Sequence, residues 1–349
     1  MQAAVYHGIE DIRIETVPTP EPGPDEAVMR VGAAGICGTD LRIYGNGHHR
    51  IPEGETRILG HELAGEIVAV GANVTALKPG MRVGIAPNMG CGHCPQCVAG
   101  WTNLCADYTA FGISLNGAFA EYMLITQEAI EQGNIVPIPA DVPMHVAALA
   151  EPLSCVMNGQ DAVNIRPGDS VMVVGAGPIG LMHVQLARLS GARQVIMSEL
   201  SDTRLEEAAA QGADVLINPA RDDVKARVLE ATDGEGANVV IIAAPAARAQ
   251  EEALDWVSRQ GRINLFGGLP KDRPTIQFNS NLVHYKQLMV TGTTGSNVRQ
   301  YRASMGLIVA GRIKLDEIAR PRLPLDQIHE GIARSKSGKD MRVLIEPSA

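Results

Sequence analysis

The 349-residue chain has few aromatic side chains, no surplus of positive charge and no long apolar run. Aromatic residues make up 3% of the chain, which argues against a binding pocket lined with stacked rings. The formal net charge is −9, which disfavours binding to a phosphate backbone, so we expect no nucleic-acid partner. No run of about 18 apolar residues is free of charged or turn-forming residues, so we expect no membrane partner.

Cysteine is also scarce, with six residues in the chain, yet four of the six are crowded together. They follow the metal-binding pattern C-x2-C-x2-C-x7-C, at Cys91, Cys94, Cys97 and Cys105. Four thiolates suit Zn²⁺ in a closed structural site. Disulfides would need an oxidising compartment, and the chain begins MQAAVYHG, without the charged and apolar regions of a signal peptide. We therefore predict a structural zinc site in a cytoplasmic protein.

The length predicts two domains, because a single hydrophobic core rarely grows beyond about 250–300 residues. Short apolar or alternating runs, separated by glycine and proline turns, are found in the first 150 residues at Ala27–Val31, Ala64–Val70 and Arg82–Ile85. Such runs are typical of strands. They predict a β-rich domain that carries the four-cysteine loop.

After Glu151, apolar runs alternate with helical patterns, which predicts a parallel sheet covered by helices on both faces. The expected helices are Pro178–Leu189 and Asp202–Gln211, and the expected strands are Ser170–Val174, Gln194–Met197, Val215–Ile217, Val239–Ala243, Arg262–Phe266 and Leu288–Thr291. The residues from about 295 onward do not extend this series. We expect them to pack back onto the first domain.

A glycine motif, G-x-G-x-x-G, follows the first of these strands and opens a helix, which is the arrangement of a dinucleotide site. Gly175 allows the tight turn, Gly177 lets the backbone approach a pyrophosphate, and Gly180 permits close packing of helix and strand. The helix N-terminus stabilises the phosphate charge. The residues that we expect to bind the cofactor are Gly175, Gly177, Pro178, Ile179, Gly180, Glu199 and Arg204.

The acidic residue among them indicates which dinucleotide is bound. Glu199 ends the second strand, 19 residues beyond Gly180, where a carboxylate holds a ribose diol. Because a carboxylate repels a 2′-phosphate, the sequence favours NAD over NADP. Arg204, five residues later, weakens that preference.

A second metal site is predicted from two isolated motifs, Gly35-Ile36-Cys37-Gly38-Thr39-Asp40 and Gly60-His61-Glu62. A catalytic zinc needs three protein ligands and an open position, and Cys37 and His61 are suitable first ligands. Glu62 could bind the metal directly or orient a ligand. Glu151, at the start of an expected helix, is the other candidate, whereas Cys155 is expected to be a buried, inert thiol. The third ligand stays open between the two glutamates.

Five motifs occur in the order G-I-C-G-T-D, G-H-E, the four-cysteine lobe, E-P-L and G-A-G-P-I-G. In order and spacing the chain resembles the zinc-dependent medium-chain dehydrogenase/reductase family, and within it the polyol (sorbitol-type) branch. The resemblance implies an α/β fold with two domains. Residues 156–294 would form a Rossmann domain, a doubly wound parallel sheet that binds NAD. Residues 1–155 and 295–349 would form a β-rich, GroES-like catalytic domain with its zinc lobe at about 88–107.

The resemblance also implies the roles of the site residues. Cys37 and His61 would bind a catalytic zinc, and Glu62 and Glu151 would supply the remaining ligand directly or through water. Thr39 would be the hydroxyl that relays the proton of the alcohol to solvent. Glu151 stands where ordinary alcohol dehydrogenases have a cysteine, which favours the polyol branch over enzymes for simple primary alcohols.

The implied reaction is hydride transfer from a secondary alcohol of a polyol or sugar alcohol to NAD, with one catalytic and one structural Zn²⁺. An amino-alcohol dehydrogenase of the threonine type and a sugar-phosphate dehydrogenase stay open as alternatives. Outside the enzymes, a zinc-stabilised, nucleotide-binding regulator is a further alternative. The implied partners are a small alcohol substrate and other copies of the chain, in a tetramer or dimer.

Two polar segments are candidates for substrate contacts. One is Asn46-Gly47-His48-His49-Arg50, whose charge favours a polyhydroxylated or phosphorylated ligand, with a solvated loop as the alternative. The other comprises Thr293, Thr294, Ser296 and Asn297. These side chains could bind sugar hydroxyls or satisfy the backbone of their own loop.

Overall fold

The computed structural model describes residues 1–348, which form two compact units. One unit comprises Met1–Ser154 together with the segment from Ser296 onward, and the other comprises Cys155–Gly295. No helix within these described residues has both the length and the apolar character needed to cross a bilayer. The predicted assignment of a catalytic and a cofactor-binding role to separate domains stays a prediction.

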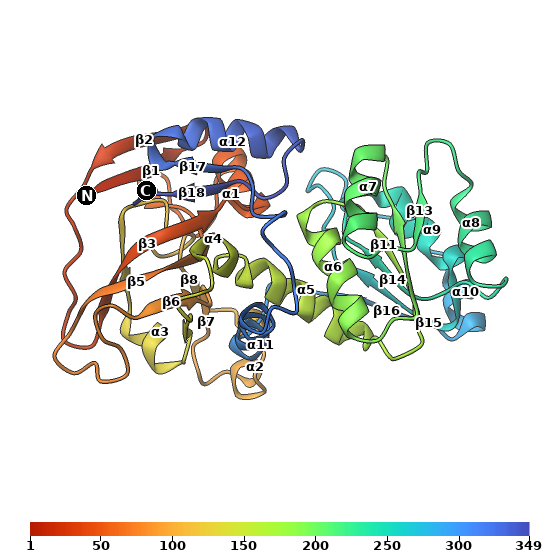
Figure 1. Cartoon of the computed structure of the whole chain (residues 1–349), viewed down its shortest axis with the longest axis horizontal. Helices are drawn as coiled ribbons and strands as arrows, with labels where there is room; N and C mark the ends of the chain where they lie inside the picture. The colour runs from red at the N-terminus through yellow and green to blue at the C-terminus, as the bar shows by residue number, and fades with distance from the viewer. Residues whose placement is uncertain (349) are drawn as a thin grey trace. The chain divides into compact units, whose positions relative to one another are not determined.

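The first unit is built from mainly antiparallel sheets (Figure 1). Its strands are β1 (Gln2–Gly8), β2 (Asp11–Thr16), β3 (Ala27–Gly35), β4 (Arg57–Ile58), β5 (Glu62–Val70), β6 (Arg82–Ile85), β7 (Asn88–Met89), β8 (Thr109–Ala110), β9 (Tyr122–Ile125), β10 (Ile135–Pro137), β17 (Arg322–Pro324) and β18 (Leu344–Glu346). The largest sheet has the order β10-β6-β5-β3-β18-β17, with β9 also paired to β3. Smaller sheets are β2-β1-β4 and β7-β8.

The helices of this unit are short, and the C-terminal segment returns to its largest sheet. They are α1 (Gly38–Asn46), α2 (Pro95–Val98), η1 (Thr102–Leu104), α3 (Gln127–Glu131), α4 (Met144–Ala147), α11 (Val298–Val309), η2 (Leu325–Gln327) and α12 (Ile328–Ser337). Strand β18 pairs antiparallel with β3, with Leu344 opposite Gly35. The backbone N–H of Ile36 also donates to the carbonyl of Val343 at 2.9 Å. The end of the chain therefore lies beside the turn that contains Cys37.

Helix α5 (Ala150–Val163) leads into the second unit, a parallel sheet in the order β13-β12-β11-β14-β15-β16. This is the strand order of dinucleotide-binding folds. Its elements are β11 (Ser170–Val174), α6 (Pro178–Leu189), β12 (Gln194–Ser198), α7 (Asp202–Ala210), β13 (Val215–Ile217), α8 (Val224–Ala231), β14 (Ala237–Ile242), α9 (Ala247–Trp256), β15 (Val257–Leu265), α10 (Ser280–Lys286) and β16 (Met289–Gly292). Helices α6 and α7 cover one face, and α8, α9 and α10 cover the other (Figure 1).

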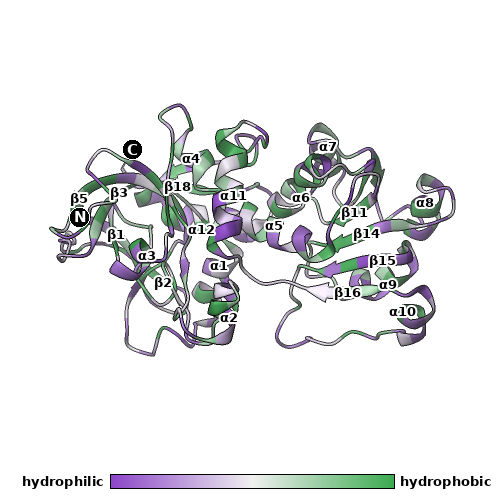
Figure 2. Ribbon diagram, turned by 90° about the horizontal axis from the view of Figure 1, so that it is seen from below, coloured by the Kyte–Doolittle hydropathy of each residue, from purple (hydrophilic) through white to green (hydrophobic). Residues whose placement is uncertain are grey.

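Burial on both faces explains the composition of the central strands. All five residues of β11 are buried, and five of the six in β14 are apolar and fully buried. Both strands are coloured as hydrophobic in Figure 2. A strand that is covered by helices on both faces has no polar side to alternate with an apolar one.

Helix α6, which begins at the glycine motif, buries a histidine. His183 is fully buried, and its ring packs edge-on against that of Phe266 at 4.9 Å between centroids. The side-chain nitrogen of Gln160 lies 3.3 Å from His183 Nδ1, and His183 Nε2 has no hydrogen-bond partner in the described residues. Burial lowers the pKa of His183 to about 3, so the imidazole is neutral in the folded chain at pH 7.

We predict that acid destabilises the chain partly through His183. An unfolded histidine has a pKa of about 6.5, so below that pH the unfolded chain binds a proton that the folded chain excludes. The contribution of His183 to stability is therefore intact above pH 6.5 and is lost as the pH falls towards 3. Between pH 7 and pH 5 the loss should be about 2 kcal/mol.

Urea unfolding at both pH values checks this prediction. The His183→Gln variant should lose less stability than the wild type between pH 7 and pH 5. The matched control is His329→Gln, at an exposed histidine, which should lose as much as the wild type. Equal losses in all three proteins would contradict the role assigned to His183.

Candidate metal centres and dinucleotide site

A single buried carboxylate ties together the two turns that carry Cys37 and His61. Cys37 is the N-cap of α1, and Asp40 Oδ2 accepts a hydrogen bond from its backbone N–H at 2.8 Å. Asp40 Oδ1 accepts another from the backbone N–H of Gly60 at 3.2 Å and lies 3.5 Å from His61 Nδ1. Asp40 was not among the predicted site residues. Its sequence signal is the acidic residue three positions after an N-cap.

The structure brings Cys37, His61 and Glu62 into one group, with their ligand atoms all within 4.8 Å of one another. Within the described residues, His61 Nδ1 and both carboxylate oxygens of Glu62 are buried without a hydrogen-bond partner. Burial lowers the pKa of His61, but the negative charge of Asp40 and Cys37 outweighs it and holds that pKa well above its ordinary value. Buried ligand atoms without hydrogen-bond partners, next to the negative charge of Asp40 and Cys37, fit a divalent cation. Sulfur, nitrogen and oxygen ligands suit Zn²⁺.

Glu62 also faces a buried arginine that the sequence analysis missed. Its Oε1 lies 3.3 Å from Nη1 of Arg342, which donates to the carbonyl of Ile36 at 3.1 Å. A Cβ at Gly35 would collide with the Glu62 carboxylate, so a larger residue there would displace that carboxylate. Arg342 precedes β18, and only the pairing of β18 with β3 brings it to the site. No local motif could have revealed this contact.

Glu151 is not a member of the three-ligand group in the described residues. It lies in the first turn of α5 and is 6% exposed. Burial lowers the pKa of Arg342, but the negative charges of Glu62, Cys37 and Glu151 raise that pKa above its ordinary value. The charge of Glu151 is therefore felt by the same arginine that contacts Glu62. Direct ligation by Glu151 stays a prediction, and Glu62 is the carboxylate that the fold brings to Cys37 and His61.

The polar loop after α1 is attached to the four-cysteine lobe. Arg50 Nη2 donates to the carbonyl of Ala106 at 2.9 Å, and its guanidinium lies 4.3 Å above the centre of the Tyr108 ring. His48 and His49 stack at 4.5 Å between ring centroids. Arg50 therefore attaches this loop to the lobe.

The other polar segment, at residues 293–297, bonds largely within the fold. Ser296 Oγ lies 2.6 Å from Ser154 Oγ. The side chain of Asn297 caps α11 by accepting from the backbone N–H of Gln300 at 3.0 Å. Both side chains therefore have structural partners, but only Asn297 bonds to the backbone of its own segment, as the alternative considered from the sequence proposed.

The four lobe cysteines also form one group, with their sulfur atoms all within 4.8 Å, and none of them is in a disulfide. Backbone hydrogen bonds from His93 and Cys94 lower the pKa of Cys91 to about 6, whereas burial raises the pKa of Cys97 to about 12. Without a cation, the four sulfurs therefore could not all be thiolates at neutral pH. A Zn²⁺ with four sulfur ligands satisfies all of them.

The base of the lobe is held by one glutamine. The amide of Gln132 donates to the carbonyl of Gly90 at 2.8 Å and accepts from its N–H at 3.2 Å. A Cβ at Gly90 would collide with the sulfur of Cys97, so only glycine fits beside the cluster.

The glycine motif in the second unit has the form expected of a dinucleotide site. Gly175 has φ +98°, which favours glycine, and a Cβ on Gly180 would overlap the carbonyl oxygen of Gly175. Gly177 is the N-cap of α6 and faces open space, since a Cβ there would meet no atom within 4 Å. Pro178 and Ile179 are the first residues of α6. The open space beside this helix N-terminus fits a pyrophosphate.

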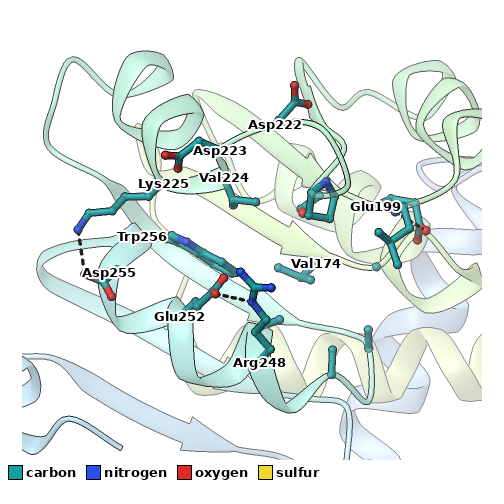
Figure 3. A pocket seen from close by; sticks show the side chains of 17 residues that line it. Val174, Glu199, Asp222, Asp223, Val224, Lys225, Arg248, Glu252, Asp255 and Trp256 are labelled. Carbon is teal, nitrogen blue, oxygen red and sulfur yellow. Dashed lines mark hydrogen bonds and ion pairs between the residues drawn. The ribbon is translucent and has the colours of Figure 1, made fainter.

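A cavity of about 670 Å³ adjoins this motif at the carboxyl ends of the strands (Figure 3). Glu199, on its wall, accepts backbone N–H bonds from Ala176 at 2.8 Å, Leu200 at 2.7 Å and Ser201 at 3.0 Å. The predicted residue Arg204 does not line the cavity, and its guanidinium lies 3.6 Å from Glu207. The charged side chains that line the cavity are Glu199, Asp222, Asp223, Lys225, Arg248, Glu252 and Asp255.

We predict that Cys94→Ser removes the lobe zinc. A serine hydroxyl is a poor replacement for a thiolate ligand, and a metal bound only by the folded chain contributes to its stability. Metal analysis should find one zinc ion fewer per chain, and the melting temperature should fall by several degrees. The control Cys155→Ser, outside both ligand groups, should keep the wild-type zinc content. Unchanged zinc and melting temperature in Cys94→Ser would exclude a structural site there.

We predict that Asp40→Ala weakens zinc binding at the Cys37 centre. The substitution leaves two backbone N–H groups unpaired and removes the carboxylate that lies 3.5 Å from His61 Nδ1. Loss of such a partner typically costs about 10- to 100-fold in metal affinity. Competition with a chelator should show one of two zinc ions released more readily, and Asp40→Asn, which keeps an acceptor oxygen, should be intermediate. Wild-type retention of both ions in Asp40→Ala would refute the role.

Comparison with known proteins shows the family of the chain. The family profile described as "Alcohol dehydrogenase GroES-like domain" matches residues 23–140, and "Zinc-binding dehydrogenase" matches residues 178–310. The chain is 37% identical to L-threonine 3-dehydrogenase of Pyrococcus horikoshii, over 99% of this chain and 97% of the relative. It is 32% identical to sorbitol dehydrogenase of Bacillus subtilis, over 100% and 98%.

A solved structure from Sinorhizobium meliloti 1021, assigned as a zinc-binding dehydrogenase and bound to NADP, has a TM-score of 0.91 and 33% identity over 99% of both chains. Together the matches confirm the predicted fold class, a GroES-like domain with a Rossmann domain, and the predicted use of zinc and a nicotinamide cofactor. They also confirm that the protein is a dehydrogenase. The chain belongs to the zinc-dependent medium-chain dehydrogenase/reductase family.

Proposed function

We propose that the chain oxidises a secondary alcohol of a small polar molecule, with a polyol or sugar alcohol as the first candidate. The observation that carries this proposal is the group of Cys37, His61 and Glu62, whose ligand atoms all lie within 4.8 Å of one another. When bound, Zn²⁺ supplies a Lewis acid for the substrate hydroxyl, and NAD accepts the hydride.

The residues around the centre would each have a separate task. Asp40 joins the Cys37 turn to the backbone of Gly60 and lies beside His61, as described above. Arg342 balances the charge of Glu62, whose carboxylate faces both the arginine and the ligand group. Thr39, two residues from Cys37 in the first turn of α1, would take up the proton that the alcohol releases.

The charge of the cavity beside the glycine motif supports NAD as the cofactor. Five carboxylates and two cations line it, and both cations are already paired: Lys225 with Asp255 at 3.0 Å and Arg248 with Glu252 at 2.6 Å. An additional 2′-phosphate would enter a negatively charged site with no unpaired cation among these lining residues. The Sinorhizobium relative binds NADP, so we attribute the preference proposed here to these side chains and not to the fold.

A second candidate, an amino-alcohol dehydrogenase of the threonine type, is favoured by the relatives. The Pyrococcus threonine dehydrogenase is 37% identical to this chain, against 32% for the Bacillus sorbitol dehydrogenase. Glu151 and the polar loop after α1 are compatible with either substrate, because both carry a secondary hydroxyl beside another polar group.

We propose that the protein works as a homo-oligomer in the cytoplasm. Zinc-binding cysteines that form no disulfide are typical of a reducing compartment, which supports this location. Strand β16 ends its sheet, and within the described residues its outer edge pairs with no other strand. Met289 on this strand and Tyr285 on the preceding helix are exposed apolar side chains. An unpaired edge with apolar neighbours can pair with another copy of the chain.

A substrate panel with NAD and NADP tests the proposed activity. Sorbitol, xylitol, L-threonine and a primary alcohol should be compared, and we expect a polyol with NAD to exceed the primary alcohol, and NAD to exceed NADP, by about tenfold in kcat/KM. The Cys37→Ala variant should abolish turnover. Threonine turnover far above every polyol would favour the second candidate, and no reduction of either cofactor would refute a dehydrogenase of these alcohols.

A further inference from the structure

An arginine one turn beyond Cys37 has donor capacity that the fold does not use. Arg42 Nη2 donates to Oγ1 of Thr39 at 2.9 Å, in an i, i+3 contact on α1. The Arg42 side chain is exposed, and within residues 1–348 it has no carboxylate at ion-pair distance. A guanidinium has five N–H donors, and only one of them is used in this contact.

The other charged groups around the Cys37 turn are already engaged. Arg342 contacts Glu62 and the carbonyl of Ile36, and Arg50 is held by Ala106 and Tyr108. Asp40, beside Thr39, is buried and accepts two backbone N–H bonds, so it does not neutralise Arg42. Arg42 therefore presents an uncompensated positive charge next to the hydroxyl of Thr39.

The chemistry of arginine limits what this charge can do. A guanidinium has no acceptor and does not lose its proton in proteins, so Arg42 cannot take over a proton that Thr39 receives. It can instead bind a carboxylate or a phosphate through two parallel hydrogen bonds. One hydrogen bond joins its guanidinium to the Thr39 hydroxyl, which we assign to accept the proton of the alcohol, so an anionic group near the reacting hydroxyl is the kind of group that Arg42 would meet.

We propose that Arg42 recognises an anionic group on the substrate, so that the enzyme prefers a secondary alcohol that carries a carboxylate or a phosphate. This inference rests on the proposed function, because it uses the role given to Thr39. It narrows the substrate class from polar secondary alcohols in general to charged ones. The alternative is a purely local contact, in which Arg42 only stabilises the first turns of α1. The test must distinguish this role from recognition of an anion.

Pairs of substrates that differ only in charge give this test. L-threonine against L-threoninamide tests the carboxylate, and sorbitol 6-phosphate against sorbitol tests the phosphate. The measured quantity is the ratio of kcat/KM for the anionic member to that for the neutral member, with NAD and the zinc-loaded protein. Binding of each compound to the protein with NADH, by isothermal titration calorimetry, gives a second readout that does not depend on turnover.

We expect one of the two pairs to favour its anionic member, with a ratio that Arg42→Gln lowers by about 10- to 100-fold, mainly through KM. Arg42→Lys keeps the charge and should retain part of the ratio. The control Arg227→Gln removes another helical arginine, half-buried and in contact with Glu230 three residues later, and should leave the ratio as in the wild type.

Three results would overturn the proposal. The wild type could favour the neutral member of both pairs in turnover and in binding. Arg42→Gln could change both members of a pair equally, which indicates a structural role in α1. Calorimetry could show no difference between the wild type and Arg42→Gln for either anion. If no alcohol is oxidised but Arg42 still selects an anion in calorimetry, the proposed function fails while the anion site stands.

Discussion

The hydrogen bonds of the Asp40 carboxylate are the constraint on which the candidate catalytic centre depends. The two turns that carry Cys37 and His61 are separate in sequence, and neither turn by itself determines the position of the other. Asp40 joins them by accepting the backbone N–H groups of Cys37 and Gly60. Because Asp40 is buried, these bonds are not shared with solvent, and they keep the ligand atoms close together.

The two units offer groups of different electrostatic character to their ligands. The first unit gathers sulfur and carboxylate groups, whose negative charge is unfavourable until a cation compensates it. The second unit offers backbone N–H groups at the start of α6 and a cavity bordered mainly by carboxylates. The N–H groups suit a pyrophosphate, and the carboxylates suit hydroxyl groups. The two candidate metal sites and the glycine motif thus lie in separate units with different electrostatic character.

Much of this arrangement could be predicted from the sequence, because local patterns carry it. The strand and glycine motif at 170–180 were predicted with the bounds that the structure has, since periodicity and glycine spacing depend only on neighbouring residues. The four-cysteine group follows for the same reason. Arg342 could not be predicted, because it reaches Glu62 through the pairing of β18 with β3, a contact between the two ends of the chain. The choice between Glu62 and Glu151 likewise depends on tertiary packing.

X-ray absorption spectroscopy at the zinc edge tests the central claim most directly, because it counts the ligands of the metal in the purified protein. The account predicts two zinc ions per chain with five sulfur ligands in total at about 2.3 Å. Four sulfurs bind the first ion, and one sulfur binds the second, together with nitrogen and oxygen ligands. Removing the sulfur of Cys37 should leave a spectrum of purely sulfur-bound zinc. A wild-type spectrum with sulfur ligands alone would contradict a metal centre built from Cys37, His61 and a glutamate.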